Sequence, residues 1–343
     1  FRKLKIAIHN TKGKFSDDWI KYCERSKIPY KLVNCYDDNI IENLSDCDGL
    51  LWHFSHNNPK DFLFGKQLMY SLETAGKSVF PDFKTMWHFD DKVGQKYLLE
   101  AVDAQIVHTF VFYNKSDAMK WLNETTFPKV FKLRKGAGSQ NVRLIKNKSE
   151  AINLVNQAFG SGFRQYEALS NLKERVRKYR LGKTSFKDVA KGVVRLGYTT
   201  DFDKTAGREK GYIYFQEFIP NNDHDIRVIV IDEKAFAIKR MVRENDFRAS
   251  GSGNILFEKE LFNIDTIKLS LDLNKKLNSQ CLVIDYVFKD NKPLIVEISY
   301  GYTKEPYYNC PGYWDKNLNW HEGSFNPQHW MVDLITKQIG SKL

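Results

Sequence analysis

The chain has 343 residues, a formal net charge of +11, and apolar and charged fractions typical of a globular protein. Its length allows roughly two or three domains, and no run of about 18 apolar residues is present that could span a membrane. Five cysteines without a C-x-x-C pair argue against a zinc or redox motif and favour a reducing cytoplasm. The positive charge indicates acidic partners; because zinc-finger, RNA-recognition and basic-zipper signatures are missing, we expect a nucleotide or anionic metabolite, not nucleic acid.

Residues 1–88 are predicted to alternate strands with helices, which favours a small parallel α/β sheet. The strands are Lys5–His9, Tyr30–Asn34 and Gly49–Phe54, and the helices are Asp17–Arg25, capped by Ser16, and Pro59–Ala75. Ligands of such sheets bind beyond the carboxyl ends of the strands. The polar residues at that place after the third strand are either a polar loop or part of a substrate pocket: His53, Ser55, His56 and Asn57.

Residues 89–211 are predicted to begin with a helix, Asp90–Ala104, with Asp90 as its cap and Lys92 in its first turn. The helix dipole disfavours a cation there, so Lys92 should be solvated or have an anionic partner. The other regular elements expected are strand Ile106–Phe112 and helices Lys115–Asn123 and Ser149–Phe159.

A glycine loop lies within Phe127–Ile145, between two runs of alternating apolar residues that predict a β-hairpin. Glycines let backbone N–H groups approach and surround an anion, and Lys132 would point from the first strand toward it. No Gly-Lys-Ser/Thr step opens a helix, so this is not a Walker loop. The alternative is a plain hairpin with a flexible, basic tip.

A strongly basic stretch runs from about residue 161 to residue 210. It is either a solvated, partly helical insertion or a basic arm that contacts an anionic substrate, a partner or a membrane surface.

Residues 212–343 are strongly β in pattern. Strands are expected at 212–219, 225–231 and 234–242, followed by helix Ile264–Leu277, a hairpin over 281–299, an irregular aromatic tail and helix Gln328–Ile339. Asp285 and Glu297 face one another across that hairpin, each among apolar residues. Two buried carboxylates repel, and Mg²⁺ bound to nucleotide phosphates would relieve that cost. The alternative is two carboxylates on a solvent face.

These pieces, in this order, resemble the ATP-grasp superfamily from about Asp90 to Tyr302. The motifs that carry the resemblance are QEFI followed by DIR, then NDFR, then a hairpin with an aspartate and VEIS, and they are most similar to the branch of the ribosomal-protein glutamate ligases. The resemblance implies an α/β (α+β) ATP-grasp fold. Its parts would be an amino-terminal α/β domain (1–88), a lid with the phosphate loop and basic insertion (89–211), and an antiparallel-sheet subdomain (212–343).

The same resemblance implies ATP and Mg²⁺ as cofactors and assigns site residues. Lys92 and Lys132 would bind phosphates beneath a mobile loop formed by Gly136, Ala137, Gly138 and Ser139. The adenine would lie against Gln216, Glu217, Phe218 and Ile219, with backbone groups of Glu217 and Ile219 bonding the base. Asp223, or alternatively Asp225, would hold the ribose, and Arg227 and Arg248 would be the catalytic arginines. The metal ligands would be Asp285, Glu297 and Ser299, the last in place of the family's asparagine.

The implied activity is that of a carboxylate–amine ligase acting on small molecules through an acyl-phosphate. Val283 stands where the D-alanine ligase branch has an arginine, which argues against that branch. The tail resembles ATP-grasp proteins of bacterial surface-polysaccharide synthesis, so a uronic acid or an anionic, sugar-linked acceptor is one candidate substrate. The alternatives are an ATP-grasp kinase and a nucleotide-binding regulatory protein with little turnover.

Overall fold

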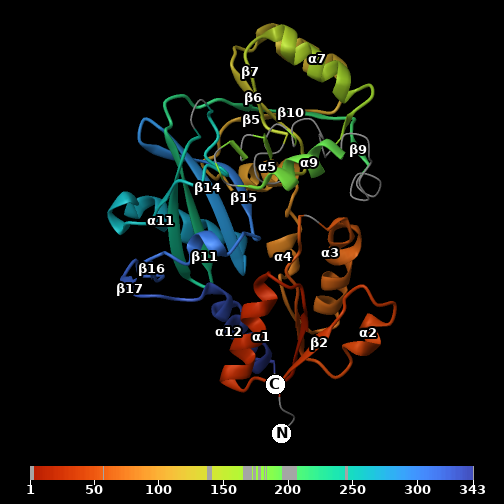
Figure 1. The fold of residues 1–343 in the computed structure, drawn as a ribbon, viewed down its shortest axis with the longest axis vertical. Helices are drawn as coiled ribbons and strands as arrows, with labels where there is room; N and C mark the ends of the chain where they lie inside the picture. Colours follow the sequence, from red (N-terminus) through yellow and green to blue (C-terminus); the bar gives the residue numbers. More distant parts are fainter. Residues whose placement is uncertain are drawn as a thin grey trace.

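The computed structural model describes residues 4–56, 58–136, 141–164, 172, 175–176, 179–180, 182, 184–194, 207–243 and 246–342. Within them the predicted mixed α/β class is confirmed: there is a four-stranded parallel sheet, a four-stranded and a seven-stranded antiparallel sheet, and a small two-stranded sheet. Figure 1 shows how these parts are arranged. No helix among these residues is both long and apolar enough to cross a membrane.

The amino-terminal sheet is parallel, in the order β2-β1-β3-β4, as the alternating pattern predicts. Its strands are β1 (Ile6–His9), β2 (Tyr30–Val33), β3 (Gly49–Leu51) and β4 (Ser78–Phe80), and its helices are α1 (Phe15–Ser26), α2 (Ile40–Asn43), α3 (Pro59–Thr74) and α4 (Phe83–Met86). One local prediction is wrong: Ser16 does not cap α1. The cap position is Lys14, and the Ser16 hydroxyl accepts a hydrogen bond from the Thr11 N–H at 2.9 Å.

The lid sheet has the order β5-β10-β6-β7 and lies at the top of Figure 1. Its strands are β5 (Thr109–Phe112), β6 (Lys129–Lys132), β7 (Arg143–Ile145) and β10 (Ile213–Glu217). Helices α6 (Lys115–Glu124) and α7 (Lys148–Ala158) pack on it around a separate apolar core that includes Leu122, Phe131 and Phe215. The predicted glycine-loop hairpin is confirmed by the antiparallel pairing of β6 with β7. Beside this sheet lie β8 (Phe163–Arg164), β9 (Arg208–Glu209) and α9 (Phe186–Val194).

The largest sheet has the order β15-β14-β11-β12-β16-β17, with β13 paired to β12. Its members are β11 (His224–Ile231), β12 (Lys234–Met241), β13 (Ile255–Leu256), β14 (Cys281–Lys289), β15 (Lys292–Ser299), β16 (Gly312–Trp314) and β17 (Trp320–Glu322). Helices α5 (Lys92–Ala101) and α11 (Ile264–Leu277) cover one face through Leu99, Ile267 and Leu273. Short 3-10 turns, η1 (Lys259–Leu261) and η2 (Glu305–Tyr307), complete this part.

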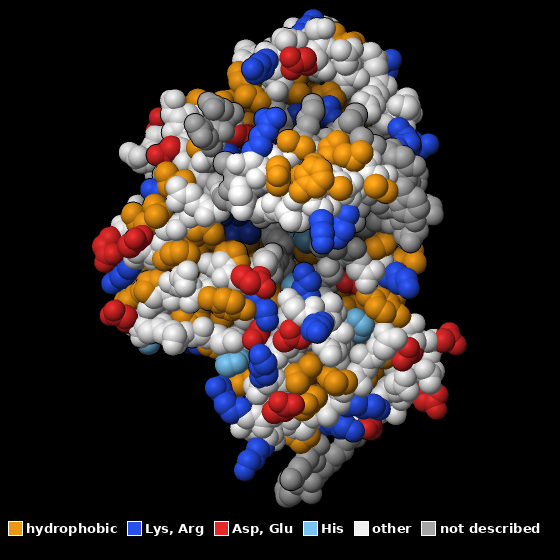
Figure 2. Space-filling view, viewed as in Figure 1, with side chains coloured by type: hydrophobic (Ala, Val, Ile, Leu, Met, Phe, Trp, Pro, Cys, Tyr) orange, Lys and Arg blue, Asp and Glu red, His pale blue; other side chains and the backbone are white. Residues whose placement is uncertain are grey.

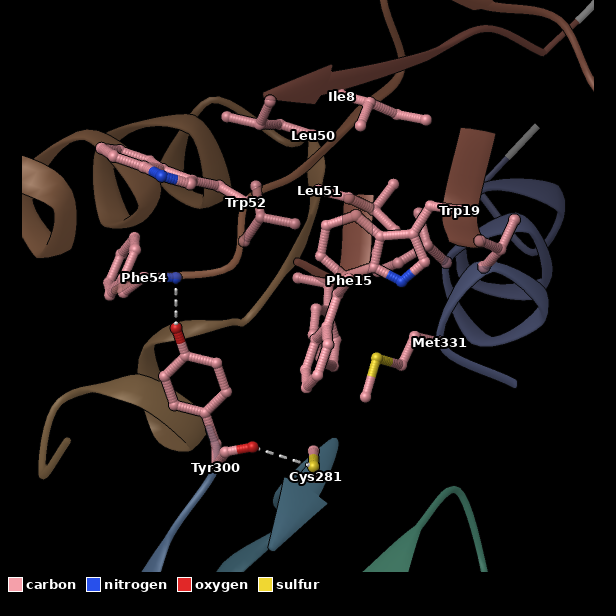
Figure 3. Packing of buried hydrophobic residues seen from close by; sticks show 14 of the residues in the cluster. Ile8, Phe15, Trp19, Leu50, Leu51, Trp52, Phe54, Cys281, Tyr300 and Met331 are labelled. Atoms are coloured by element: carbon pink, nitrogen blue, oxygen red, sulfur yellow. Dashed lines mark hydrogen bonds between the residues drawn. The ribbon is translucent and has the colours of Figure 1, made fainter. Parts of the chain in front are cut away.

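The other face of the largest sheet shares one apolar core with the amino-terminal sheet and the last helix, α12 (Pro327–Gly340). Figure 3 shows how Tyr300 joins these parts: its hydroxyl accepts from the Phe54 N–H at 3.0 Å, and its carbonyl accepts from the Cys281 thiol at 3.3 Å. Met331 of α12 belongs to the same core. The chain segment that follows β15 is therefore held inside the amino-terminal core.

Candidate nucleotide-binding site

A cavity of about 510 Å³ lies where the lid sheet, the largest sheet and the amino-terminal sheet meet. Figure 2 shows the molecule hollowed below the lid on this face. The cavity brings together most of the site residues predicted from the sequence: Lys92, Lys132, Gly136, Gln216, Glu217, Phe218, Ile219, Arg227, Arg248, Asp285, Glu297 and Ser299. Ala137, Gly138 and Ser139, predicted for the phosphate loop, lie outside the described residues.

Lys92 stands in the first turn of α5, and of the two predicted alternatives, solvation or an anionic partner, the structure shows the anionic partner. Its buried ammonium lies 3.1 Å from a Glu297 carboxylate oxygen and donates to the Gly136 carbonyl at 2.8 Å. Burial lowers the pKa of Lys92, but Glu297 and Asp90 outweigh it and raise that pKa overall. The lysine therefore stays charged at the mouth of the glycine loop.

The predicted cap of α5 needs correction. Asp91, not Asp90, caps the helix, by accepting from the Gly94 N–H at 2.9 Å. Asp90 has a left-handed backbone (φ 55°), and its carboxylate accepts from the Gly136 N–H at 2.7 Å. Both backbone groups of Gly136 are thus held by residues at the start of α5, which positions the loop entrance over the cavity.

Lys132 points from β6 into the cavity and donates to the side-chain oxygen of Gln216 at 2.7 Å. Burial lowers the pKa of Lys132 to about 8, because its nearest hydrogen-bond partner is a neutral amide while carboxylates act on it only from farther away. A phosphate group arriving here would supply the missing negative charge.

The predicted adenine segment forms the end of β10 and the turn after it. The Glu217 N–H donates to the His108 carbonyl at 2.9 Å, and its carboxylate lies 3.0 Å from the Lys129 ammonium. The Glu217 N–H and side chain are thus both engaged with neighbouring parts of the lid. Phe218 contacts Phe247 edge-on, with the ring centroids 5.9 Å apart, so an apolar wall stands beside the hinge.

Asp223, predicted to bind the ribose, does not line the cavity. Its side chain is 75% exposed and accepts from His224 at 2.5 Å. Asp225, the alternative, does line the cavity, but both of its oxygens accept from Arg240, at 2.7 and 2.6 Å. Asn221 and Asn222 line the cavity next to the hinge instead. The sequence pattern could not decide between Asp223 and Asp225. Asp223 lies before β11 begins, where the alternation of side chains between the two faces of a strand does not apply.

Three neighbouring strands bring a row of charged side chains to the cavity wall. Arg227 of β11 donates two hydrogen bonds to Asp285 of β14, at 2.6 and 2.7 Å. Arg240 of β12 also approaches Asp285, at 3.0 Å. Burial raises the pKa of Asp285, but the two arginines outweigh it and hold that pKa well below its usual range. Arg248 also lines the cavity and pairs with Asp246 at 2.6 Å.

The sequence analysis missed Arg240, although a signal for it exists. Phe236 and Ile238 alternate on the face of β12 that enters the shared core, and Arg240 continues that alternation. A charged side chain on an apolar face must find a buried partner or a ligand.

The predicted metal carboxylates are paired in register across the last hairpin, Asp285 opposite Glu297, and both face the cavity. Among the described residues, no three His, Cys, Asp or Glu side chains form a metal-binding group of their own. This donor set fits Mg²⁺, which takes one or two carboxylates and obtains its other ligands from phosphates and water. The Ser299 hydroxyl is engaged with the backbone of Gly301, donating to its carbonyl and accepting from its N–H, each at 3.1 Å.

The loop after β3, interpreted as either a polar loop or part of a pocket, lines the cavity through His53, Ser55 and His56. Asn57 lies outside the described residues. Neither the described residues of the basic stretch nor those of the aromatic tail after Thr303 line the cavity. In the basic stretch, Arg175 contacts Asp188 at 3.4 Å, while Arg177 and Lys178 lie outside the described residues. Of the tail aromatics, Tyr307 and Trp314 are buried in cores.

The fold that surrounds this cavity is similar to that of ATP-grasp proteins. Residues 183–304 match the family model described as RimK-like ATP-grasp domain. D-alanine–D-alanine ligase from Bacillus anthracis is similar over 99% of this chain and 98% of that chain, with a TM-score of 0.56 and 15% identity. A RimK domain protein ATP-grasp from Sphaerobacter thermophilus is similar over 86% and 90%, with a TM-score of 0.51 and 13% identity.

A third similar structure is the biotin carboxylase domain of the 2-oxoglutarate carboxylase from Hydrogenobacter thermophilus. It covers 97% of this chain and 69% of that chain, with a TM-score of 0.59 and 10% identity. No curated protein sequence matches this chain significantly. The similarities confirm the predicted ATP-grasp fold and the resemblance to that superfamily.

Proposed function

We propose that this protein is an ATP-dependent carboxylate–amine ligase that uses Mg²⁺. One observation carries the proposal: Lys92, Lys132, Arg227 and Arg240 converge with Asp285 and Glu297 on one wall of a cavity in an ATP-grasp fold. Such an arrangement of fixed charges is what transfer of a phosphoryl group requires, because its transition state is stabilised mainly by positioning and electrostatics.

The nucleotide would lie with its base at the Glu217–Ile219 hinge and its phosphates at the lysines. Among the described residues, Lys132 has no carboxylate within ion-pair distance, whereas Lys92 has Glu297. The negative charge of a polyphosphate would balance the positive charge that is left on this wall of the cavity. Asp285, Glu297 and Ser299 would hold Mg²⁺, which neutralises charge on the phosphates. For Asp285 to do so, Arg227 and Arg240 would turn toward the phosphate oxygens.

The reaction would run in two steps. A substrate carboxylate oxygen attacks the γ-phosphorus, the bond to the β-phosphate oxygen breaks, and acyl-phosphate and ADP form. An amine then attacks the acyl carbon and phosphate leaves, giving an amide and releasing one proton. No side-chain nucleophile is needed. All five cysteines are buried, and burial raises the pKa of each thiol, so none is poised as a thiolate.

The acceptor, the molecule whose carboxylate is activated, can be proposed more narrowly. A hexuronic acid, or a sugar-linked acid of bacterial surface-polysaccharide synthesis, would present the required carboxylate on a ring. Tyr302 lines the cavity and offers an aromatic wall of the kind that suits such a ring. Reducing, cytoplasmic conditions, where ATP is supplied, are the expected setting.

The test is a screen of carboxylates and amines for ADP formation, with the mass of each product measured. Turnover that depends on the amine supports the ligase. Stoichiometric transfer of phosphate without an amine would instead mean a kinase. ATP binding without turnover of any pair would mean a regulatory nucleotide-binding protein, an alternative favoured by the engagement of the Ser299 hydroxyl with Gly301.

A further inference from the structure

The cavity extends beyond the nucleotide wall to the carboxyl edge of the amino-terminal sheet. Strands β1 and β3 are parallel neighbours, so the loops that follow them meet at one edge. Lys14, at the end of the β1–α1 loop, lines the cavity there together with His53 after β3 and Thr303 after β15. None of these three residues has a role in the nucleotide assignment above.

Lys14 differs from the other cations of the cavity. Lys92, Arg227, Arg240 and Arg248 each have a carboxylate partner, and Lys132 has the Gln216 amide. Within the described part of the chain, the Lys14 ammonium has neither a hydrogen bond nor an ion pair. It also precedes the 12-residue helix α1, whose amino-terminal dipole adds positive potential. The acids of that first turn are engaged elsewhere: Asp18 with Lys304, and Asp17 with the Gly13 N–H.

His53 provides an independent observation at the same place. Its side chain is 8% exposed, its ring stacks on Phe15 with centroids 3.7 Å apart, and its Nδ1 has no hydrogen-bond partner among the described residues. Burial, reinforced by the nearby charge of Lys14, lowers its pKa to about 3, so the imidazole is neutral at pH 7. A Cβ at Gly301 would lie 3.5 Å from its Nε2 and 3.0 Å from the Phe89 ring, so a side chain larger than glycine would crowd this corner.

We propose that Lys14 and His53 form a subsite for a second anionic group of the acceptor, a carboxylate or a phosphate, apart from the carboxyl group that is activated. A lysine without a partner supplies the charge, and a neutral, buried imidazole can share one hydrogen bond without adding charge. That the ligand of this subsite is the acceptor rests on the proposed ligase function. The anion site itself does not. It is also separate from the basic stretch, for which contact with an anionic substrate was one of the predicted alternatives.

The test is a lysine footprint of the whole chain saturated with Mg²⁺ and a non-hydrolysable ATP analogue. Inorganic phosphate, glutarate or uncharged glycerol is added at constant ionic strength, lysines are acylated briefly, and the modified peptides are counted by mass spectrometry. We expect phosphate or glutarate to protect Lys14 in a saturable manner, glycerol to have no effect, and Lys12 in the same loop to be labelled equally throughout. Whichever anion protects Lys14 at the lower concentration names the chemistry of the group.

Matched variants complete the test. Lys14→Gln should raise the dissociation constant of the protecting anion roughly tenfold, as expected for one charge-assisted contact, whereas Lys12→Gln should not change it. Equal labelling of Lys14 with and without either anion would overturn the subsite. Protection of Lys14 by the nucleotide alone would also overturn it, by placing the lysine in the ATP site. Labelling of Lys132 reports nucleotide binding separately. If the ATP analogue does not protect Lys132, the proposed function is contradicted, and the labelling of Lys14 still decides the anion subsite.

Discussion

Lys132 illustrates how one buried residue can make ligand binding depend on pH. Its pKa is lowered to about 8, so in the free protein its charge is present below that pH and lost above it. A bound phosphate favours the charged form, so binding takes up a proton at high pH. We expect the affinity for ATP to be constant below pH 8 and to fall as the pH rises above it.

Isothermal titration of ATP at a series of pH values checks this expectation. Lys132→Ala should weaken binding by a few kcal/mol at most and remove the pH dependence. Lys132→Arg should also remove the pH dependence while retaining more of the affinity, because arginine stays charged. A wild-type affinity that does not change between pH 7 and pH 10 would argue against the role of Lys132.

The two predicted metal carboxylates should differ when they are replaced. Asp285→Asn and Glu297→Gln should both abolish turnover, since each removes a charge that would hold Mg²⁺. Asp285 accepts from Arg227 and Arg240, so its replacement leaves buried arginines unpaired and should also destabilise the fold by about 3 kcal/mol. Glu297 is 34% exposed, and after its replacement Lys92 can still donate to the glutamine oxygen and to the Gly136 carbonyl, so this change should cost only about 1 kcal/mol.

Urea unfolding of the two variants, beside ADP release at limiting Mg²⁺, measures both effects. Near-normal activity in either variant would remove that residue from the metal site. Equal stability losses would contradict the asymmetry between the two carboxylates.

The charged residues of the site were predictable where the strand pattern places a charge among apolar residues. Asp285 stands in such a strand, and its pairing with Glu297 follows from hairpin register. Arg240 carries the same signal and was overlooked. Asp223 was misplaced because loop residues have no period. The engagement of Ser299 with Gly301 depends on the path of the chain after β15, which a local pattern does not contain.

Two neighbouring aspartates at the start of helix α5 have different roles. Asp91 caps the helix, and Asp90 positions the entrance of the phosphate loop. Asp91→Ala removes the helix cap and should cost about 1 kcal/mol of stability with little effect on nucleotide binding. Asp90→Ala removes the acceptor of the Gly136 N–H and should weaken ATP binding more than it lowers stability. Thermal unfolding and ATP titration of both variants check the distinction. Identical profiles for the two would contradict it.

Long, strongly patterned elements were the most predictable. Helix α11 coincides with the expected Ile264–Leu277, because its apolar stripe and its Asn263 cap are both local features. Strand β4 and helices α2 and α4 have three or four residues each and were missed. Elements of three or four residues are too short to show a period in the sequence, and their neighbours decide their conformation.

In the whole molecule, the first and last of the predicted parts, 1–88, 89–211 and 212–343, share one hydrophobic core. The core of the amino-terminal sheet includes Met331, Val332, Ile335 and Ile339 of α12 and Tyr300. We therefore expect residues 1–88, expressed alone, to lack a cooperative fold, because the apolar surface that α12 covers would be exposed. Chemical-shift dispersion and thermal unfolding of this fragment test the expectation, and a fragment joined through a linker to residues 300–342 serves as the control.

The path of Tyr300 through the amino-terminal core has a consequence for recombination between relatives. The residues proposed to select the acceptor come from two distant stretches, around Lys14 and His53 and around Gly301–Thr303, and one shared core holds both in place. A crossover near residue 88 would combine the Lys14–His53 stretch of one relative with the Gly301–Thr303 stretch of another. A chimera that takes both stretches and α12 from the same relative keeps the core and the subsite intact. Acceptor preference should therefore be transferred only when both stretches are exchanged together.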